Sequence, residues 1–305
     1  MSRLLAQIRS SAPMRRIKNI LGTRGVTFLR RCLNRSAPNL DDYKTRLAGK
    51  KALELGGPSD LFLDHGCLPI YSVLATADNC LFSDRTIWTG EVGDGRGFHY
   101  HPEKQPGLQL FADATDLGQI PNESYGAVLA SHCLEHIANP LRALYEWKRV
   151  LTGDGLLLLL LPHKDGTFDW RRPVTRLEHM IQDYERKTTE EDLTHVPEIL
   201  ELHDLERDSA AGSPEQFRQR CLDNQHTRAM HHHVFDTQTA AGLVHYAGFQ
   251  LIHVAAIKPF HIIILAEKRD DRNGLQEDSG AFFQANAEFC ARSPFSSDRK
   301  GNSRR

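Results

Sequence analysis

The sequence of this 305-residue chain lacks several features that would place it in a particular class of protein. A membrane-spanning helix needs roughly 20 apolar residues, but the longest apolar run is six leucines, Leu156–Leu161. The six cysteines include no CxxC pair, which argues against a disulfide framework or a cysteine zinc site and favours a reducing compartment. We therefore expect a cytoplasmic protein of ordinary globular composition, with 25% charged and 40% hydrophobic residues.

Acidic residues are absent from the first 40 positions, which carry nine arginines or lysines. The remainder is acidic, with 29 basic against 39 acidic residues, and this balance argues against a nucleic-acid partner. Apolar stripes such as Leu4, Leu5 and Ile8 predict helices within a basic N-terminal arm over residues 1–46. Three interpretations are open: helices packed on the main domain, which we favour, a helix lying peripherally on an anionic membrane, and a cleaved targeting segment.

Strand and helix patterns alternate between residues 47 and 268 and predict one α/β domain. Seven apolar segments are expected to be strands, and the last two to pair antiparallel at the sheet edge. They lie within 50–57, 71–78, 108–113, 125–131, 156–162, 249–256 and 261–268. Leu156–Leu161 show no alternation, which is typical of a central parallel strand covered on both faces.

Local signals mark the ends of two helices. Asn139 and Pro140 predict the start of a helix. The asparagine side chain can accept a hydrogen bond from a backbone N–H group that has no partner within the first turn, and proline suits the first helical position. Asp236 is expected to cap a second helix, which Gly248 stops.

Two segments do not fit the alternating pattern. Residues 165–233 are rich in acidic side chains and predict a mostly helical cap insertion over the mouth of the site. Residues 269–305 are polar and charged, and we expect them to be a disordered tail.

Four motifs, in their order and spacing, resemble the class I S-adenosyl-L-methionine (SAM)-dependent methyltransferases, in particular the small-molecule, methyltransferase type 11-like branch. They are ALELGGPS from Ala52, FADATDL from Phe111, YGAVLASHCLEHIANP from Tyr125 and EWKRVLTGDGLLLLLLP ending at Pro162. The resemblance covers about residues 48–165 closely and 234–268 loosely. It implies a Rossmann-like, doubly wound sheet of seven mostly parallel strands in the order 3-2-1-4-5-7-6, with SAM as cofactor.

The loop after the first strand is where the resemblance places part of the cofactor. Gly56 and Gly57 lack Cβ atoms and so permit a close approach of the backbone. Glu54 either orients this loop or contacts the amino-acid end of SAM. The chain departs from the usual E-x-G-x-G-x-G pattern at Pro58 and Ser59. No GxGxxG opens a helix here, which disfavours the alternative of a nicotinamide-dependent dehydrogenase.

The resemblance implies further cofactor contacts at the ends of the next three strands. Asp78 is expected to end the second strand and bind the ribose hydroxyls through charge-assisted hydrogen bonds, with a solvated loop acid as the alternative. Asp113 and Ala114 are expected at the adenine ring, and Ser131 beneath the transferable methyl group.

Methyl transfer to a hydroxyl needs alignment and a base, and histidine titrates in the useful range. His132 is the first candidate, with packing in the cofactor loop as the alternative, and His163 and His233 are further candidates. The run His231–His233 has three possible roles: its side chains line the substrate pocket, pack within the protein interior, or bind a metal ion. Three consecutive histidines cannot all point one way and no HxxxH pair accompanies them, so we predict no metal site.

The acceptor is not evident from the motifs. Asp169, Arg171 and Arg172 either line the pocket mouth, where arginines suit a carboxylate, phosphate or sugar acid, or form surface ion pairs. We expect O-methylation of a small-molecule or glycan acceptor. The alternative from a different class is a methyltransferase-like protein that binds SAM without catalysis.

Overall fold

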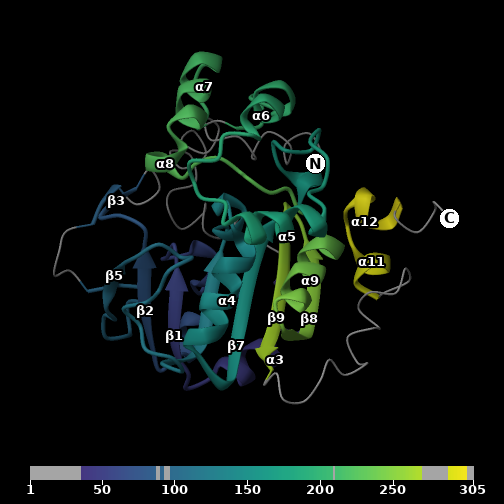
Figure 1. Cartoon of the computed structure of the whole chain (residues 1–305). Helices are drawn as coiled ribbons and strands as arrows, with labels where there is room; N and C mark the ends of the chain where they lie inside the picture. The colour runs from purple at the N-terminus through teal and green to yellow at the C-terminus, as the bar shows by residue number, and fades with distance from the viewer. Residues whose placement is uncertain (1–35, 87–89, 93–96, 209, 270–287, 301–305) are drawn as a thin grey trace, which may run out of the picture.

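The computed structural model describes residues 36–86, 90–92, 97–208, 210–269 and 288–300 (Figure 1). Seven strands form one sheet in the order β5-β2-β1-β6-β7-β9-β8, which is the predicted order 3-2-1-4-5-7-6. Neighbours from β5 to β7 are parallel, and β9 is antiparallel to both β7 and β8. The strands are β1 (Lys51–Leu55), β2 (Thr76–Leu81), β5 (Gln109–Phe111), β6 (Tyr125–Ser131), β7 (Leu151–Pro162), β8 (Phe249–Ile257) and β9 (His261–Lys268).

All seven expected strands are present, but two have different bounds. β2 begins at Thr76 because Tyr71–Val73 forms a short 3-10 helix, η2, instead of the first half of the strand. β7 begins at Leu151, five residues before the predicted strand 156–162. Its pairing with β6 is irregular near Tyr125. Between β2 and β5, the pair β3 (Arg85–Thr86) and β4 (Gly90–Glu91) forms a small antiparallel sheet.

The helix caps predicted from the sequence are confirmed. α4 (Pro140–Val150) begins with Asn139 Oδ1 accepting from the N–H of Arg142 at 3.1 Å. α9 (Thr237–Tyr246) begins with Asp236 Oδ1 accepting from the N–H of Thr239 at 2.8 Å. Each cap satisfies one of the N–H groups that a helix start leaves without a partner.

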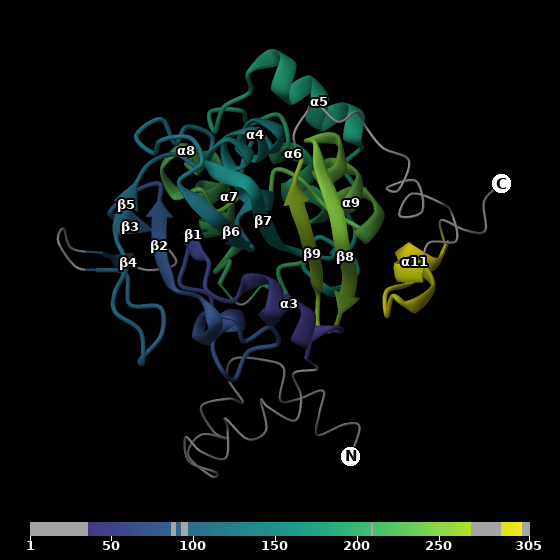
Figure 2. The ribbon, with the colours of Figure 1, turned by 90° about the horizontal axis from the view of Figure 1, so that it is seen from below.

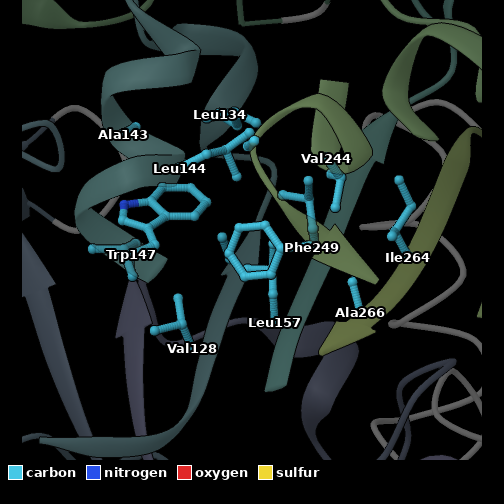
Figure 3. Close-up of a cluster of buried hydrophobic side chains, with 14 of the residues drawn as sticks. Val128, Leu134, Ala143, Leu144, Trp147, Leu157, Val244, Phe249, Ile264 and Ala266 are labelled. Atoms are coloured by element: carbon cyan, nitrogen blue, oxygen red, sulfur yellow. The ribbon is translucent and has the colours of Figure 1, made fainter. Parts of the chain in front are cut away.

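Alternate side chains of the leucine run enter two separate cores, so both faces of β7 are buried. Leu157, Leu159 and Leu161 pack with Trp147 of α4 and with α9 residues, as Figure 3 shows around Leu157. Leu156, Leu158 and Leu160 pack on the opposite face with residues of α3 (Leu40–Leu47). Figure 2 shows α4 and α9 on one side of the sheet and α3 on the other.

The predicted insertion forms a cap over the carboxyl ends of the parallel strands (Figure 1). Its helices are η4 (Lys164–Gly166), α5 (Leu177–Arg186), α6 (Val196–Leu202), α7 (Pro214–Leu222) and α8 (Asn224–Thr227). Val196, Ile199, Phe217 and Met230 belong to a small apolar core of its own. The cap is therefore a second packed layer as well as a set of loops.

The two ends of the chain are only partly described. Most of the predicted basic arm lies outside the described residues, but its last part forms α3, whose Tyr43 and Leu47 are buried against the sheet. The tail differs from the expected disorder at 288–300, where α11 (Glu288–Arg292) and α12 (Ser296–Lys300) form and Phe295 is fully buried. In the described residues, no helix has the length and hydrophobicity to cross a membrane.

Candidate functional site

The loop after β1 is held by the carboxylate of Glu54. The backbone N–H of Ser59 donates to Oε1 at 3.1 Å, and the Tyr71 hydroxyl donates to Oε2 at 2.7 Å. The side chain is fully buried, and burial raises its pKa to about 7. These contacts fit the loop-orienting role, because both carboxylate oxygens are already used within the protein.

The two glycines after Glu54 are required by local geometry. Gly56 has a φ of +82°, a conformation that glycine adopts without steric cost. A Cβ on Gly57 would lie 2.4 Å from Cδ of Glu54. Asn79 of β2 holds the same turn from the other side, accepting from Gly57 N at 2.9 Å and donating to Gly57 O at 3.1 Å. The backbone is thus fixed where β1 ends.

The expected position of Asp78 at the end of the second strand is wrong. β2 continues to Leu81, so Asp78 lies within the strand, where the N–H of Leu108 donates to Oδ1 at 2.8 Å and the Tyr125 hydroxyl donates to Oδ2 at 2.9 Å. Its side chain is buried, so it is no solvated loop acid either. The exposed carboxylate that follows β2 belongs to Asp84.

Asp113 follows β5 and is only partly exposed. Thr115 donates to Oδ1 from its N–H and its hydroxyl, at 2.8 and 2.7 Å, and Arg228 of the cap donates to Oδ2 at 2.9 Å. Burial alone would raise the pKa of Asp113, but these donors hold it below its usual range. The neighbouring Ala114 accepts from Nε1 of Trp147 through its carbonyl oxygen at 3.0 Å.

Arg228 is a residue that sequence reasoning missed. Its guanidinium also lies 3.0 Å from Glu190 and 5.2 Å from the ring centre of Phe82, which follows β2. The cap is thereby tied to the ends of both β2 and β5. No local sequence motif marks Arg228, and other arginines such as Arg218 and Arg220 lie near it in the chain, so nothing in the sequence singles it out.

The end of β6 brings Ser131 and His132 beside the glycine loop. The Ser131 hydroxyl is 3.0 Å from that of Ser59. His132 has a φ of +52°, which is strained for a residue with a side chain and is a feature of functional sites. Its Nδ1 is 3.6 Å from Oε1 of the buried Glu135, and its Nε2 is 3.0 Å from Nδ1 of His261.

The charges around His132 are set by these neighbours. Burial alone would raise the pKa of Glu135, but the hydrogen bond with His132 and the nearby His136 lower it, so Glu135 is ionised. Burial lowers the pKa of His261 to about 3, so this imidazole is neutral. A quarter of the His132 side chain is exposed, so one imidazole at the sheet edge is both accessible and backed by a carboxylate.

His163 is not placed for catalysis. It follows β7, is fully buried, and stacks on Phe295 with 3.9 Å between ring centres. Its Nε2 lies 3.1 Å from Oδ1 of the buried Asp298 in α12. The tail that was expected to be disordered therefore covers this candidate base.

The run His231–His233 divides between two surroundings, as the sequence had indicated. His231 Nδ1 lies 2.6 Å from Asp169, whose other oxygen accepts from Arg172 at 3.0 Å. Arg172 is buried, whereas Arg171 is half-exposed and lies 3.6 Å from Asp204. The three residues expected at a pocket mouth thus have different roles, and Arg172 is a buried structural cation.

His233 lies in the cap with two histidines that sequence reasoning did not connect to it. One ring nitrogen each from His179, His195 and His233 lie within 4.8 Å of one another. Burial lowers the pKa of His233 well below its usual value, so it is neutral. The structure thus separates His233 from His132, although both were candidates for the same chemistry.

Comparison with known proteins gives one matching family model and several similar solved structures. Residues 99–159 match the family model described as a methyltransferase domain. No curated protein sequence matches the chain. A SAM-dependent methyltransferase structure from Mesorhizobium loti is similar, with 12% identity and a TM-score of 0.42 over 76% of this chain and 96% of that one.

Two further solved structures have comparable scores. One is a SAM-dependent methyltransferase from Methanosarcina mazei, with 14% identity and a TM-score of 0.42 over 77% of this chain and 99% of that one. The other is an O-methyltransferase family 2 protein from Planctomyces limnophilus in complex with apigenin, with 12% identity and a TM-score of 0.38 over 72% and 50%. Likenesses at these identities and TM-scores do not identify the activity of this chain.

Proposed function

We propose that this chain is a class I SAM-dependent methyltransferase that methylates a hydroxyl group of a small-molecule or glycan acceptor, with His132 as the general base. The observation that carries the proposal is the pairing of a partly exposed imidazole with the buried carboxylate of Glu135 at the end of β6. In sheets of this type, ligands bind outside the carboxyl ends of the strands.

The residues at this edge fit SAM. Gly56 is exposed and brings the backbone of the β1 loop to the sheet edge without a Cβ, while Gly57 is buried against Glu54 and Asn79 fixes the turn. Asp84 and Asp113 offer carboxylate oxygens after β2 and β5 for the ribose hydroxyls and the adenine amino group. When bound, SAM supplies an activated methyl group on a positively charged sulfur.

The protein's own contribution is to hold the acceptor and take its proton. With Glu135 ionised, the Nδ1–H tautomer of His132 is favoured, which leaves Nε2 as the basic nitrogen. His261 now occupies Nε2 at 3.0 Å. An acceptor hydroxyl must therefore replace the imidazole of His261, which lies on β9, before His132 can accept its proton.

The surface of the cap supports a polar acceptor. Trp170 is 40% exposed, and its ring lies 5.0 Å from the guanidinium carbons of both Arg171 and Arg207. Both arginines and the indole N–H also contact the carboxylate of Asp204, so a carboxylate or phosphate of the acceptor would share donors that already hold one anionic group. Arg172, by contrast, is buried and cannot serve such a ligand.

The test separates binding from turnover. Calorimetry with SAM and with NAD is followed by incubation of methyl-labelled SAM with a panel of small-molecule and glycan alcohols. We expect SAM binding, no NAD binding and label transferred to an oxygen atom. His132→Gln should keep SAM affinity and lower turnover by roughly 10²–10⁴-fold.

His226→Gln is the matched control, because His226 is 76% exposed and pairs with Asp223 outside this edge. Its turnover should equal that of the parent protein. Label on nitrogen or carbon would refute the hydroxyl acceptor, and an equal loss of SAM affinity and turnover in His132→Gln would refute the base. SAM binding without transfer to any alcohol would favour a binding protein.

A further inference from the structure

Four polar side chains from three segments of the cap lie close together. His179 and Asp183 lie one turn apart on α5, His195 precedes α6, and His233 lies between α8 and α9. His179 Nε2 is 3.1 Å from His195 Nε2 and 3.4 Å from Asp183 Oδ2. His233 Nε2 is 3.8 Å from the same carboxylate oxygen.

Hydrogen bonds within the protein do not satisfy this cluster. Asp183 Oδ2 and His233 Nδ1 are buried and have no hydrogen-bond partner. The Nε2–H of His233 can donate a hydrogen bond to the carbonyl oxygen of Ala138 at 3.2 Å. Its Nδ1 then carries a lone pair, and no hydrogen-bond donor faces it. Buried polar atoms of this kind almost always have a partner, so a group is missing from the cluster.

The donor set and its spacing match those of a tetrahedral metal ion. Zinc binds histidine nitrogens and carboxylate oxygens at about 2.0–2.2 Å, which places neighbouring donors about 3.3 Å apart. The contacts of 3.1 Å between His179 and His195 and of 3.4 Å between His179 and Asp183 lie close to this value. His233 would bind through Nδ1, because its Nε2–H donates to Ala138. A ligating histidine whose other N–H donates to a backbone carbonyl, and a ligating carboxylate that is itself hydrogen-bonded, are the usual supports of such a site. Asp183 Oδ1 accepts from Thr188 at 3.2 Å.

We propose that His179, His195 and His233 bind one Zn²⁺ ion, with Asp183 as the fourth ligand after a small movement of its side chain. The proposal does not depend on the methyl acceptor or on His132. It departs from the expectation of no metal site, which rested on the absence of a local histidine motif. The ligands are separated by up to 54 positions, so only the fold brings them together.

The coordination explains what the ion does. Four protein donors close a tetrahedral shell and leave no position for a substrate, as in structural zinc sites. The ion joins α5, the start of α6 and the segment before α9, and so holds three segments of the cap together. The His179 side chain is 38% exposed, which gives the ion a path from solvent.

A second cluster, formed by Glu135, His136 and His231, is a poorer candidate. His231 already has a carboxylate of Asp169 at 2.6 Å from Nδ1. Glu135 lies within 3.6 and 3.9 Å of His132 and His136. These groups neutralise one another, and Glu135 supports the candidate base.

The test uses the full-length chain, stripped of metal with a chelator and titrated with Zn²⁺. Calorimetry should give one ion per chain, and a 100-fold excess of Zn²⁺ over its Kd should raise the melting temperature by roughly 5 °C. Replacement by Co²⁺ should give the visible absorption of a tetrahedral ion without thiolate charge-transfer bands. This spectrum tests the donor set on the unaltered protein, whatever the folding of any variant.

Variants locate the ion. His179→Gln and Asp183→Asn should each weaken Zn²⁺ binding at least tenfold, and exposed His226→Gln should leave it unchanged. Absence of stoichiometric binding, or an octahedral Co²⁺ spectrum, would overturn the proposal. So would zinc that His179→Gln retains and His231→Gln loses, because the ion would then lie at the second cluster.

Discussion

The sheet edge and the cap above it hold their buried polar groups in different ways. At the edge, both oxygens of Glu54 and both of Asp113 are used by donors from the protein. In the cap, Asp183 Oδ2 and His233 Nδ1 have no partner, and at the edge the same holds for Glu135 Oε2 beneath His132. The carboxylates of Glu54 and Asp113 are thus satisfied within the protein, whereas the groups beside the proposed base and ion each keep a buried atom without a hydrogen-bond partner. Other buried atoms, such as the Tyr43 hydroxyl, share this property, so it supports the two proposals only together with their geometry.

The largest expected effect on the free energy of unfolding comes from a buried charge in the cap. Arg172 has a side chain only 1% exposed and pairs with Asp169 at 3.0 Å and Glu198 at 2.9 Å. Arg172→Met should lower the free energy of unfolding by about 3–5 kcal/mol, because it removes a buried cation that donates to Asp169 and to the carbonyl oxygen of His231 and leaves both acceptors short of a donor. Urea denaturation measures this loss.

Arg171→Met is the matched control for that change. Arg171 is 46% exposed and lies 3.6 Å from Asp204, so its replacement should cost less than about 1 kcal/mol. Equal losses in the two variants would show that the cap does not depend on buried charge, and the contrast between cap and edge would then disappear.

The next effect concerns Glu54 at the sheet edge and the pH dependence of stability. Its pKa is about 7 in the folded protein and 4.5 in the reference state, so the folded state binds more protons between these values. This group's contribution to stability is therefore lost as pH rises from about 4.5 to 7, by at most about 3 kcal/mol.

Glu54→Gln cannot titrate and isolates this contribution. Buried neutral histidines such as His261 give an opposite slope, but they do so in both proteins, so the difference between the two unfolding curves reports Glu54 alone. We expect the parent protein to lose stability relative to Glu54→Gln as pH rises through this window, measured by urea unfolding at several pH values. Parallel curves would mean that folding does not change the pKa of Glu54.

The sheet was predictable because its signals are local. Uninterrupted leucines, Asn139 with Pro140, and Asp236 each act within a few residues, and their elements formed as expected. The start of β2 was misplaced because Tyr71 has strand-like neighbours in sequence, yet its hydroxyl is needed by Glu54 across the fold. That tertiary contact decides where the strand begins.

The site was less predictable because it depends on contacts between distant segments. β2 ends at Leu81, whereas the predicted strand ended at residue 78, so Asp78 lies within the strand. Asn79, the next residue, hydrogen-bonds to Gly57 in the glycine loop. His163 was a reasonable candidate until the tail placed Phe295 against it. His179 and His195 were present in the sequence without any spacing that linked them to His233.

The smallest effect tests whether Asp113 serves the cofactor as well as the cap. Its Oδ2 accepts from Arg228, but its side chain remains 33% exposed, so it can still receive the adenine amino group. Asp113→Ala should weaken SAM binding by about 1.5–3 kcal/mol, the usual loss of a hydrogen bond to a charged group. Asp116→Ala, three residues on, is the control, because the exposed Asp116 side chain accepts only from Gly118 among the hydrogen bonds found in the described residues. Calorimetry that gives equal SAM affinity for both variants would leave Asp113 with a single role, that of anchoring Arg228, and would move the adenine contact elsewhere on the sheet edge.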